Sequence, residues 1–564
     1  MKRTGAQMVW EVLTRERVEV VFGYPGGAIM PVYDAMLGYG VHHVLVRHEQ
    51  GAAHMADGYA RASGRVGVAL ATSGPGATNL TTGIATAMLD SSPMVCITGQ
   101  VPSKLLGSDA FQETDITGVT LPITKHNFLV TRVEEIAPVL HQAFAIARGG
   151  RPGPVLVDIT KDAQQASCEY DGEAPLATPR PLGEAMALEL KRALAMIDEA
   201  ERPLLLMGQG VVQSGASAAL RLLAEKADIP VAATLLGLGG FPATHPLALG
   251  MMGMHGEAWV NQAIQEADLI VALGMRFDDR VTGDPRRFAP HARKVHVEID
   301  RAEINKTVRV DVALVADVRQ VLEALVAGAA LRTHVSWRQR IVALKAAAAG
   351  RDILTRPDDG KLHAAHVIDE LWRATNGGAL VVTDVGQHQM WEAQYYKHER
   401  PRSLVTSGGL GTMGFALPAA IGARFARPHD EIWVVAGDGG FQMTACELST
   451  LAQEGKKLNI AVINNGFLGM VRQWQELFYE RRYAATPMLS PDFVKLAEAH
   501  GLTGLRVETR QELATTIAEA RRQTGSVVID FRVAAEENVY PMVPSGGDIG
   551  EMIRRPHTPA RGAA

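Results

Sequence analysis

The sequence has few cysteines, few aromatic residues and no excess of positive charge. Its three cysteines, Cys96, Cys168 and Cys446, are too few and too scattered for a disulfide framework, and none has the paired spacing of a zinc site. Aromatic residues make up only 5% of the 564 residues. The formal net charge of −5, without a strongly basic segment, argues against a nucleic-acid-binding surface. We therefore expect a protein of the reducing cytoplasm that does not bind nucleic acid.

Long apolar runs are also missing. No uninterrupted apolar stretch reaches the roughly 20 residues that span a bilayer, and residues 1–19 lack the apolar core of a signal peptide. We expect no membrane anchor. Hydrophobic residues (47%) and charged residues (21%) have the balance of a globular protein. Glycine is abundant, at 56 residues, which indicates many places where the backbone approaches a neighbour or a ligand closely.

Short β-rich runs alternate with longer helical patterns along the chain, which predicts α/β folds with parallel sheets. The runs fall into three sets, separated by polar stretches at about 164–184 and 350–361. We predict three doubly wound parallel-sheet domains at 1–165, 185–345 and 362–545. The first and third share a strand, glycine-rich turn and helix pattern. This shared pattern favours two related domains that flank a different one, with room for a ligand between the related pair.

The strongest motif lies in the third domain, where one apolar run ends in Gly-Asp-Gly and a later one ends in Asn-Asn. Parallel strands end at the same edge of a sheet, so Asp438 and Asn465 are expected to converge there. Their hard oxygen atoms suit Mg²⁺ that is also bound to phosphate. Gly439 and Gly440 would let backbone amides and a helix N-terminus approach the phosphates. A Gly-Asp-Gly triplet alone is typical of a plain turn; the two halves at this spacing favour a binding site.

This pair of motifs resembles the thiamine diphosphate-binding motif of thiamine-dependent enzymes. The resemblance implies thiamine diphosphate held through Mg²⁺, with the main-chain carbonyl of Phe467 as a further metal ligand beside Asp438 and Asn465. Glu49 follows the apolar run at 44–46. It matches the glutamate that hydrogen-bonds the cofactor's aminopyrimidine ring and so assists catalysis. Considered alone, a glutamate at a helix start is more often a surface residue.

The same resemblance implies further contacts with thiamine diphosphate. Met413 matches the bulky apolar residue beneath the bent cofactor, although methionine at such a place is also ordinary core filling. Gly411 belongs to the same segment. Gln387 and His388 match a segment that contacts the diphosphate, and His388 equally fits a plain loop histidine.

Over nearly its whole length the sequence is similar to the catalytic large subunits of acetohydroxyacid synthase, also called acetolactate synthase. The resemblance implies a transferase that decarboxylates pyruvate and joins the two-carbon unit to a second pyruvate or to 2-oxobutanoate. The products would be 2-acetolactate and 2-aceto-2-hydroxybutanoate, for the biosynthesis of valine, leucine and isoleucine. The segments that carry the resemblance include VFGYPGGAIMPVYDA (21–35), RHEQGAAHMADGYARA (47–62), ATSGPGATNL (71–80), RFDDRVTG (276–283), TDVGQHQMW (383–391) and GMVRQWQELF (469–478).

The segment at 276–283, together with Gly-Met-His-Gly at 253–256, resembles the FAD-binding signature of the anabolic enzymes. The implied FAD is structural and takes no part in net redox chemistry. A guanidinium pairs well with phosphate, and acids at strand ends can reach a ribose hydroxyl. For the charged residues at 278–280 a solvated salt-bridge cluster is the alternative. The implied FAD contacts are Arg151, His255, Gly256, Arg276, Glu298, Asp300 and Asp317.

Residues near the reacting groups follow from the same resemblance. Gly27 is expected to offer a backbone amide to a developing oxyanion, and Gln112 to donate a hydrogen bond to the reacting species. The implied substrate contacts are Arg280 for the carboxylate, Val385 for the methyl group of the first pyruvate, and Met470 and Trp474 at the second site, where Trp474 favours 2-oxobutanoate.

The family also implies an assembly. Glu49 and Asp438 come from different chains in the family, so a homodimer is the expected minimum, with a tetramer as the alternative. A small regulatory subunit is a further implied partner.

Three other interpretations stay open on the sequence alone. Pyruvate oxidase shares the fold, thiamine diphosphate, magnesium and FAD, but passes electrons to an acceptor; the segment at 276–283 and Trp474 argue against it. Glyoxylate carboligase has an apolar residue in place of Glu49. A non-catalytic protein of this fold would lack Glu49 or the metal pair, and all three residues are present.

Overall fold

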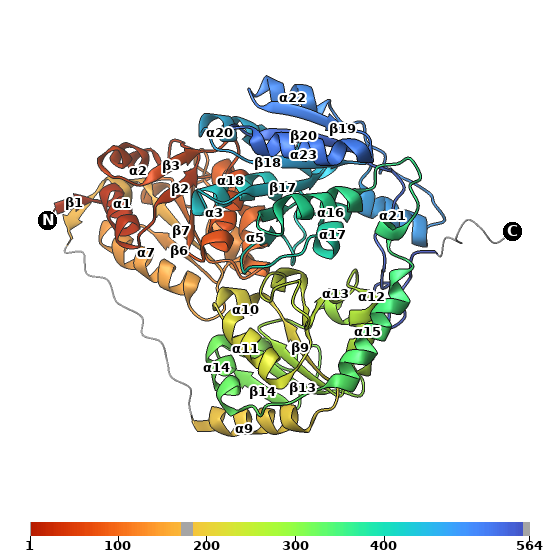
Figure 1. The fold of residues 1–564 in the computed structure, drawn as a ribbon. Helices are drawn as coiled ribbons and strands as arrows, with labels where there is room; N and C mark the ends of the chain where they lie inside the picture. Colours follow the sequence, from red (N-terminus) through yellow and green to blue (C-terminus); the bar gives the residue numbers. More distant parts are fainter. Residues whose placement is uncertain (1, 171–183, 557–564) are drawn as a thin grey trace.

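The computed structural model describes residues 2–170 and 184–556. They form three α/β domains, each built on a sheet of six parallel strands, and this confirms the predicted fold class. The N-terminal domain (red and orange) lies beside the C-terminal domain (teal and blue), and the central domain (yellow and green) lies below both in Figure 1. Of the polar stretch predicted at 164–184 as a linker, residues 171–183 lie outside the described residues.

The N-terminal sheet has the strand order β3-β2-β4-β5-β7-β6. A short antiparallel pair, β1 (Lys2–Thr4) and β8 (Ser167–Glu169), joins the two ends of this domain. The strands are β2 (Val20–Gly23), β3 (His42–Leu45), β4 (Gly67–Ala71), β5 (Met94–Gln100), β6 (His126–Val130) and β7 (Pro154–Thr160). The helices are α1 (Gly5–Arg15), α2 (Met30–Ala35), α3 (Glu49–Ser63), α4 (Pro75–Asn79), α5 (Thr81–Leu89), α6 (Ile116–Thr120), α7 (Val133–Arg148) and α8 (Lys161–Gln165).

The C-terminal sheet repeats the same topology as β16-β15-β17-β18-β20-β19. Numbered within each domain, both orders read 2-1-3-4-6-5, which confirms the predicted relation between the two outer domains. The strands are β15 (Leu380–Thr383), β16 (Leu404–Thr406), β17 (Ile432–Gly437), β18 (Asn459–Asn464), β19 (Thr503–Val507) and β20 (Val527–Arg532). The helices are α16 (Ala364–Thr375), α17 (Gln387–Tyr395), α18 (Ala416–Ala426), α19 (Asp438–Met443), α20 (Leu448–Gln453), α21 (Gly469–Phe478), α22 (Phe493–Ala499) and α23 (Leu513–Arg522).

The central sheet differs, with the order β11-β10-β9-β12-β13-β14. Numbered within the domain this reads 3-2-1-4-5-6, the order of doubly wound dinucleotide-binding folds. The strands are β9 (Pro203–Met207), β10 (Val231–Ala233), β11 (Ala248–Met251), β12 (Leu269–Leu273), β13 (Arg293–Glu298) and β14 (Val312–Val315). The helices are α9 (Glu184–Glu199), α10 (Gln209–Gln213), α11 (Ser217–Ala227), α12 (Ala258–Glu266), α13 (Asp279–Thr282), α14 (Val318–Gly328) and α15 (Val335–Ala349).

The chain after β20 leaves the C-terminal domain and packs against the central one. The main-chain amide of Val543 donates to the carbonyl of Met254, and Gly283 pairs with Asp548 in an isolated bridge. Ile549 is buried in the core of the central domain. The end of the range expected for the third domain, 362–545, therefore falls inside a segment that contacts the central domain.

Helices α3 and α18 join the two outer domains by direct backbone contact. A Cβ on Gly58 would overlap the carbonyl oxygen of Ala419, and a Cβ on Gly422 would overlap that of Met55. The helices therefore cross antiparallel, at a distance that only glycine permits. Both helices are almost fully buried, and their alanine-rich faces belong to one core shared by the two domains.

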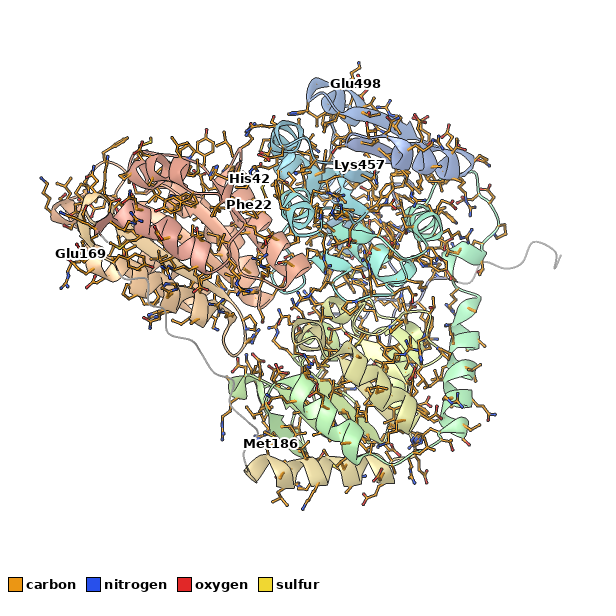
Figure 2. All side chains as sticks on the ribbon, turned by 60° about the vertical axis from the view of Figure 1, so that its left-hand side comes forward. Phe22, His42, Glu169, Met186, Lys457 and Glu498 are labelled. Carbon is orange, nitrogen blue, oxygen red and sulfur yellow. The ribbon has the colours of Figure 1, made fainter. Side chains whose placement is uncertain are left out.

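A smaller contact at the domain boundary supports this crossing. Phe22 and His42 lie on the side of the N-terminal domain that faces the C-terminal one in Figure 2. The Phe22 ring meets the edge of Phe425 with centroids 5.9 Å apart, and His42 Nε2 lies 2.9 Å from a Glu454 carboxylate oxygen. The two outer domains of one chain therefore have a fixed relative position.

Replacing Gly58 with alanine should destabilise this junction. The gain in helix propensity is about 1 kcal/mol at most, whereas overlap with a rigid main chain in a packed core costs about 1–3 kcal/mol or more. Gly40→Ala is the matched control, because a Cβ there meets no atom within 4 Å. Thermal and urea unfolding should show a lower midpoint for Gly58→Ala only; equal midpoints for the two variants would contradict the backbone contact.

Candidate functional site

Two neighbouring strands of the C-terminal sheet lead into Asp438 and Asn465. β17 and β18 pair in parallel, so the residues that follow them leave the sheet side by side at its carboxyl edge. The Asp438 carboxylate accepts hydrogen bonds from the Ser490 hydroxyl, at 2.9 Å, and from the main-chain amide of Gly466, next to Asn465. Burial raises the pKa of Asp438, and within the described residues no lysine or arginine pairs with it.

The Asn465 side chain holds a tight turn. Its Oδ1 accepts the main-chain amide of Phe467 at 3.0 Å, and its Nδ2 donates to Gln387 Oε1 at 3.3 Å. Gln387 is buried, and its own amide nitrogen donates to Gln473 Oε1 at 2.9 Å. The structure thus brings together Gln387, Asn465 and Phe467, three of the residues assigned from sequence to the cofactor and metal.

His388 contacts the Gly-Asp-Gly turn. Its Nε2 accepts the main-chain amide of Gly437 at 3.2 Å. Burial lowers the pKa of His388 to about 3, so the ring is a neutral acceptor at physiological pH. A Cβ on Gly437 would lie 2.9 Å from the ring, so His388 and the turn fit together only with glycine at 437.

A glycine-rich loop at 407–414 borders the same turn. A Cβ on Gly439 would lie 3.5 Å from Met413 Cε, and one on Gly411 would lie 3.7 Å from a Val385 methyl carbon. The loop therefore brings two predicted cofactor residues and the predicted pyruvate contact Val385 to the edge that carries Asp438.

Asp384, at the end of β15, supports this arrangement, although the sequence did not single it out. Its carboxylate accepts the main-chain amides of Val385, at 2.8 Å, and Gly414, at 2.9 Å. Burial raises the pKa of Asp384 to about 6. A Cβ on Gly440 would lie 2.5 Å from the same carboxylate, so glycine at 440 is required by close packing.

The N-terminal sheet presents a second cluster at its own carboxyl edge. Glu49 begins α3, is only 9% exposed, and accepts a hydrogen bond from Asn79 Nδ2 at 2.9 Å. A Cβ on Gly76 would lie 3.2 Å from the Glu49 carboxylate. Burial, with a smaller contribution from the Glu49 charge, raises the pKa of Tyr33. Glu49 is therefore a buried acid rather than a surface residue.

The turns that carry Gly27 and Gln112 border the same edge. Gly27 is exposed in the turn after β2, and its neighbour Ala28 donates its main-chain amide to Thr72 Oγ1 at 3.2 Å. Gln112 has a positive φ of 60°, and a Cβ on Gly74 would lie 2.8 Å from its carbonyl oxygen. The three residues assigned to catalysis from sequence thus lie at one edge of the N-terminal sheet, Glu49 at the start of α3 and Gly27 and Gln112 in turns.

Glu49 and Met413 lie at opposite ends of the antiparallel α3–α18 pair. Glu49 is the first residue of α3, whereas Met413 precedes α18 and so lies level with the other end of α3. The 15 residues of α3 span about 21 Å at 1.5 Å per residue. One ring system cannot contact both residues of the same chain.

A cavity of about 740 Å³ lies between the central domain, the C-terminal domain and the end of α5. It brings together most of the residues that the sequence assigned to FAD and to the substrates. Those in its wall are Arg151, His255, Arg276, Arg280, Glu298, Asp317, Val385, Met470 and Trp474. Gly411 and Met413, which the sequence assigned to thiamine diphosphate, line the same cavity.

Arg151 of the N-terminal domain and the acids of the central domain have internal partners. Arg151 donates to Ser91 Oγ at 2.7 Å and to Glu303 at 3.1 Å, and its Nη1 lies 3.5 Å from Asp300. Glu298, whose pKa is raised by burial, accepts the main-chain amide of Asp300 at 3.1 Å. Asp300 does not line the cavity and reaches it only through Arg151.

Three other predicted FAD contacts also stabilise the local structure of the chain. Burial lowers the pKa of His255 to about 4, and its Nδ1 lies 3.3 Å from the carbonyl oxygen of Pro541. A Cβ on Gly256 would overlap the main chain of Met252, so glycine is required there by a tight turn. Asp317 caps α14 by accepting the main-chain amide of Arg319 at 2.9 Å.

The cavity wall includes a turn that the sequence reasoning missed. The Gly-Gln-Gly sequence at 208–210 follows the first strand of the central sheet, and a Cβ on Gly210 would lie 2.7 Å from Gly274 Cα. The two turns after β9 and β12 therefore touch at the point where the strand order reverses, the place where such sheets bind ligands. The glycine pair directly after the first strand was the signal that could have found it.

Neither a metal-binding cluster of acidic, histidine or cysteine side chains nor a membrane-spanning helix is found among the described residues. Across 2–170 and 184–556, no three His, Cys, Asp or Glu side chains converge to hold a metal. Within the same ranges no helix is both long and apolar enough to cross a membrane.

Comparison with known proteins agrees with this geometry. The chain matches the N-terminal TPP binding domain of thiamine pyrophosphate enzymes at 3–119, their central domain at 190–325 and their C-terminal TPP binding domain at 384–531. It is 49% identical over 558 residues to an acetolactate synthase of Mycobacterium bovis (96% of this chain, 90% of the relative). It is 49% identical over 559 residues to an acetolactate synthase large subunit of Corynebacterium glutamicum (97% and 89%) and 45% identical over 571 residues to an acetolactate synthase of Arthrospira platensis (98% and 97%).

Proposed function

The chain belongs to the acetolactate synthase large subunits of the thiamine pyrophosphate enzyme family, and we propose how its residues carry out that reaction. Acetolactate synthesis joins the two-carbon unit of one decarboxylated pyruvate to a second 2-oxo acid, in the biosynthesis of branched-chain amino acids. The observation that carries the proposal is the meeting of the Gly-Asp-Gly turn, the loop with Met413 and the cavity wall at one sheet edge.

Thiamine diphosphate fits the C-terminal edge through Mg²⁺. Asp438 is a buried carboxylate whose partners are a hydroxyl and main-chain amides, so a divalent cation would supply the missing positive charge. Asn465 Oδ1 and the Phe467 carbonyl would complete the protein ligands, since both lie in the turn that contacts Asp438. Bound thiamine diphosphate supplies an electron sink that stabilises the carbanion left by decarboxylation.

FAD fits the cavity on the central domain. The strand order, the contact between the turns at 208–210 and 274, and the guanidinium groups of Arg151 and Arg276 are the features of a dinucleotide site. Glu298 and Asp317, at or just after the ends of neighbouring strands, are placed to meet a ribose. This FAD would stabilise the fold of the site and take no part in net redox chemistry.

The substrate residues are assigned by their place in the same cavity wall. Arg280 would bind the carboxylate of a 2-oxo acid, Val385 would contact the methyl group of the first pyruvate, and Trp474 would bound the pocket of the second. Gly27 and Gln112, on the edge that carries Glu49, would donate to the oxygen that gains charge.

The active unit would be a homodimer. Glu49 and Met413 of one chain lie about 21 Å apart along α3, so a cofactor over Met413 must receive its glutamate from a second copy. Several relatives are named as large subunits, which supports a small regulatory subunit as a further partner.

The activity itself is tested with purified protein, pyruvate and 2-oxobutanoate. We expect 2-acetolactate and 2-aceto-2-hydroxybutanoate to form only when thiamine diphosphate and Mg²⁺ are added, with retained flavin visible by absorbance. Oxygen uptake is measured in parallel, because an oxidase would consume oxygen in proportion to the pyruvate used. Product formation without thiamine diphosphate would contradict the assignment.

Two inactive variants should restore each other's activity when mixed. Glu49→Gln removes the acid from one edge and Asp438→Asn removes the metal ligand from the other. If the two groups act across chains, half of the dimers formed after subunit exchange have one intact site, giving about a quarter of wild-type activity. Each variant alone is the control, and a mixture as inactive as its components would place both groups in one chain.

Trp474→Leu should change which second substrate is chosen. A flat apolar wall rewards one additional methylene by about 1–3 kcal/mol, so its loss lowers the preference for 2-oxobutanoate by roughly tenfold or more. Phe478→Leu is the matched control, because Phe478 lies on the same helix with its ring 5.2 Å from Trp474 but does not line the cavity. The measurement is the ratio of the two products in a mixed-substrate assay. An unchanged ratio in Trp474→Leu would contradict the assignment of Trp474 to the second substrate site.

A further inference from the structure

We propose that Asp90, at the end of α5 in the N-terminal domain, is a positioning residue for the glycine-rich loop 407–414 of its own chain. This inference rests on the proposed function, because that loop carries Met413 beside the thiamine diphosphate site. No substrate or cofactor contact is assigned to Asp90; it acts through the loop.

The loop is held at both ends by buried carboxylates. At its C-terminal end, Asp384 accepts the main-chain amide of Gly414 at 2.9 Å. At its N-terminal end, Asp90 Oδ2 accepts the amide of Gly408 at 3.1 Å and Asp90 Oδ1 accepts that of Gly409 at 2.6 Å. Asp384 belongs to the same domain as the loop, whereas Asp90 comes from the other outer domain. The position of the loop therefore depends on the junction between the two domains.

Arg61 of α3 holds Asp90 in place. Its guanidinium makes two hydrogen bonds to Asp57, at 2.7 and 2.8 Å, and one to Asp90, at 2.8 Å. The remaining nitrogen donates to the carbonyl oxygen of Thr406 at 2.6 Å, and the group lies over the Phe415 ring at 5.2 Å. Thr406 and Phe415 are the residues that flank the loop, so the same cation contacts both of its ends.

The contact between Asp90 and the loop is also part of the cavity wall. A Cβ on Gly409 would lie 2.8 Å from Asp90 Oδ1 and 3.0 Å from Leu89 Cβ, so the loop fits tightly against the end of α5. Leu89 and Ser91, on either side of Asp90, line the cavity together with Gly408 and Gly409. Separation of the loop from Asp90 would therefore open the wall next to Met413.

The geometry requires both carboxylate oxygens. Each oxygen accepts a different main-chain amide, and the side chain is fully buried, so no water replaces a lost acceptor. In Asp90→Asn one oxygen becomes an NH₂ group, which would face an amide donor. Asp57 differs in this respect: within the described residues its hydrogen bonds go to Arg61, and none goes to the loop.

Asp57→Asn is therefore the matched control for Asp90→Asn. Each substitution removes one negative charge from the same buried guanidinium, but only Asp90→Asn disturbs the loop. The full-length apoprotein is titrated with thiamine diphosphate at fixed Mg²⁺ by intrinsic fluorescence, and the thermal midpoint of each variant is measured alongside.

We expect Asp90→Asn to weaken thiamine diphosphate binding by about tenfold more than Asp57→Asn does, at comparable thermal midpoints. The two variants should differ in kcat, whereas their KM values for pyruvate should agree, since Asp90 does not contact substrate. Equal dissociation constants for the two variants would overturn the proposal and leave Asp90 a structural residue only.

Gly409→Ala provides a second variant if Asp90→Asn does not fold. It keeps every charge and moves the loop away from Asp90, so it should weaken thiamine diphosphate binding in the same way; unchanged binding would contradict the proposal. Failure of the wild-type chain to bind thiamine diphosphate would instead refute the proposed function, which separates the two conclusions.

Discussion

The crossing of α3 and α18 is the constraint on which the rest of the structure depends. Gly58 and Gly422 bring the two backbones into contact, and this fixes how the outer domains face each other. The same crossing places Glu49 at the first residue of α3 and Arg61 in its last turn, about three helical turns apart. The last turn of α3 therefore supports the loop of its own chain, and in the proposed homodimer its first residue, Glu49, would serve the cofactor of the other copy.

Buried carboxylates that accept main-chain amides recur at the joints of this structure. Asp384 and Asp90 hold the two ends of the loop 407–414, and Glu447 accepts the amides of Arg47 and His48 just before α3. Burial raises the pKa of Asp384 and Glu447, which shows that desolvation is only partly offset by the amides. Such contacts cost free energy, but they fix a backbone direction more closely than an apolar contact does. The net charge of the chain, −5, does not indicate that buried carboxylates hold its joints together.

Much of the fold and site could be predicted from the sequence because their signals are local. The ends of β17 and β18 follow from apolar runs that stop at glycine and asparagine, which is why the sequence predicted that Asp438 and Asn465 leave the sheet at one edge. Strand order is not local, so the sequence could not show that β9 and β12 adjoin and that the glycine pair at 208–210 lies in the cavity wall. The role of Asp90 could not be predicted for the same reason, because the loop amides that it accepts lie more than 300 positions away in the chain. Gly256 shows a different difficulty for prediction from sequence. The sequence assigned it to FAD, but the tight turn at Met252 also requires glycine there, so the residue type alone does not indicate a ligand.

The cavity explains why a cofactor without a redox role would be retained. Its wall is built from the carboxyl ends of the central strands, the loop 407–414 and α21, with the end of α5 closing one side. The chain after β20 returns to the central domain and contacts the turn that carries Met254 and His255. A ligand that fills this space contacts segments of all three domains at once, and its binding energy opposes any motion that separates them. The central domain would then contribute to catalysis by holding Met413, Trp474 and Arg280 in one relative position.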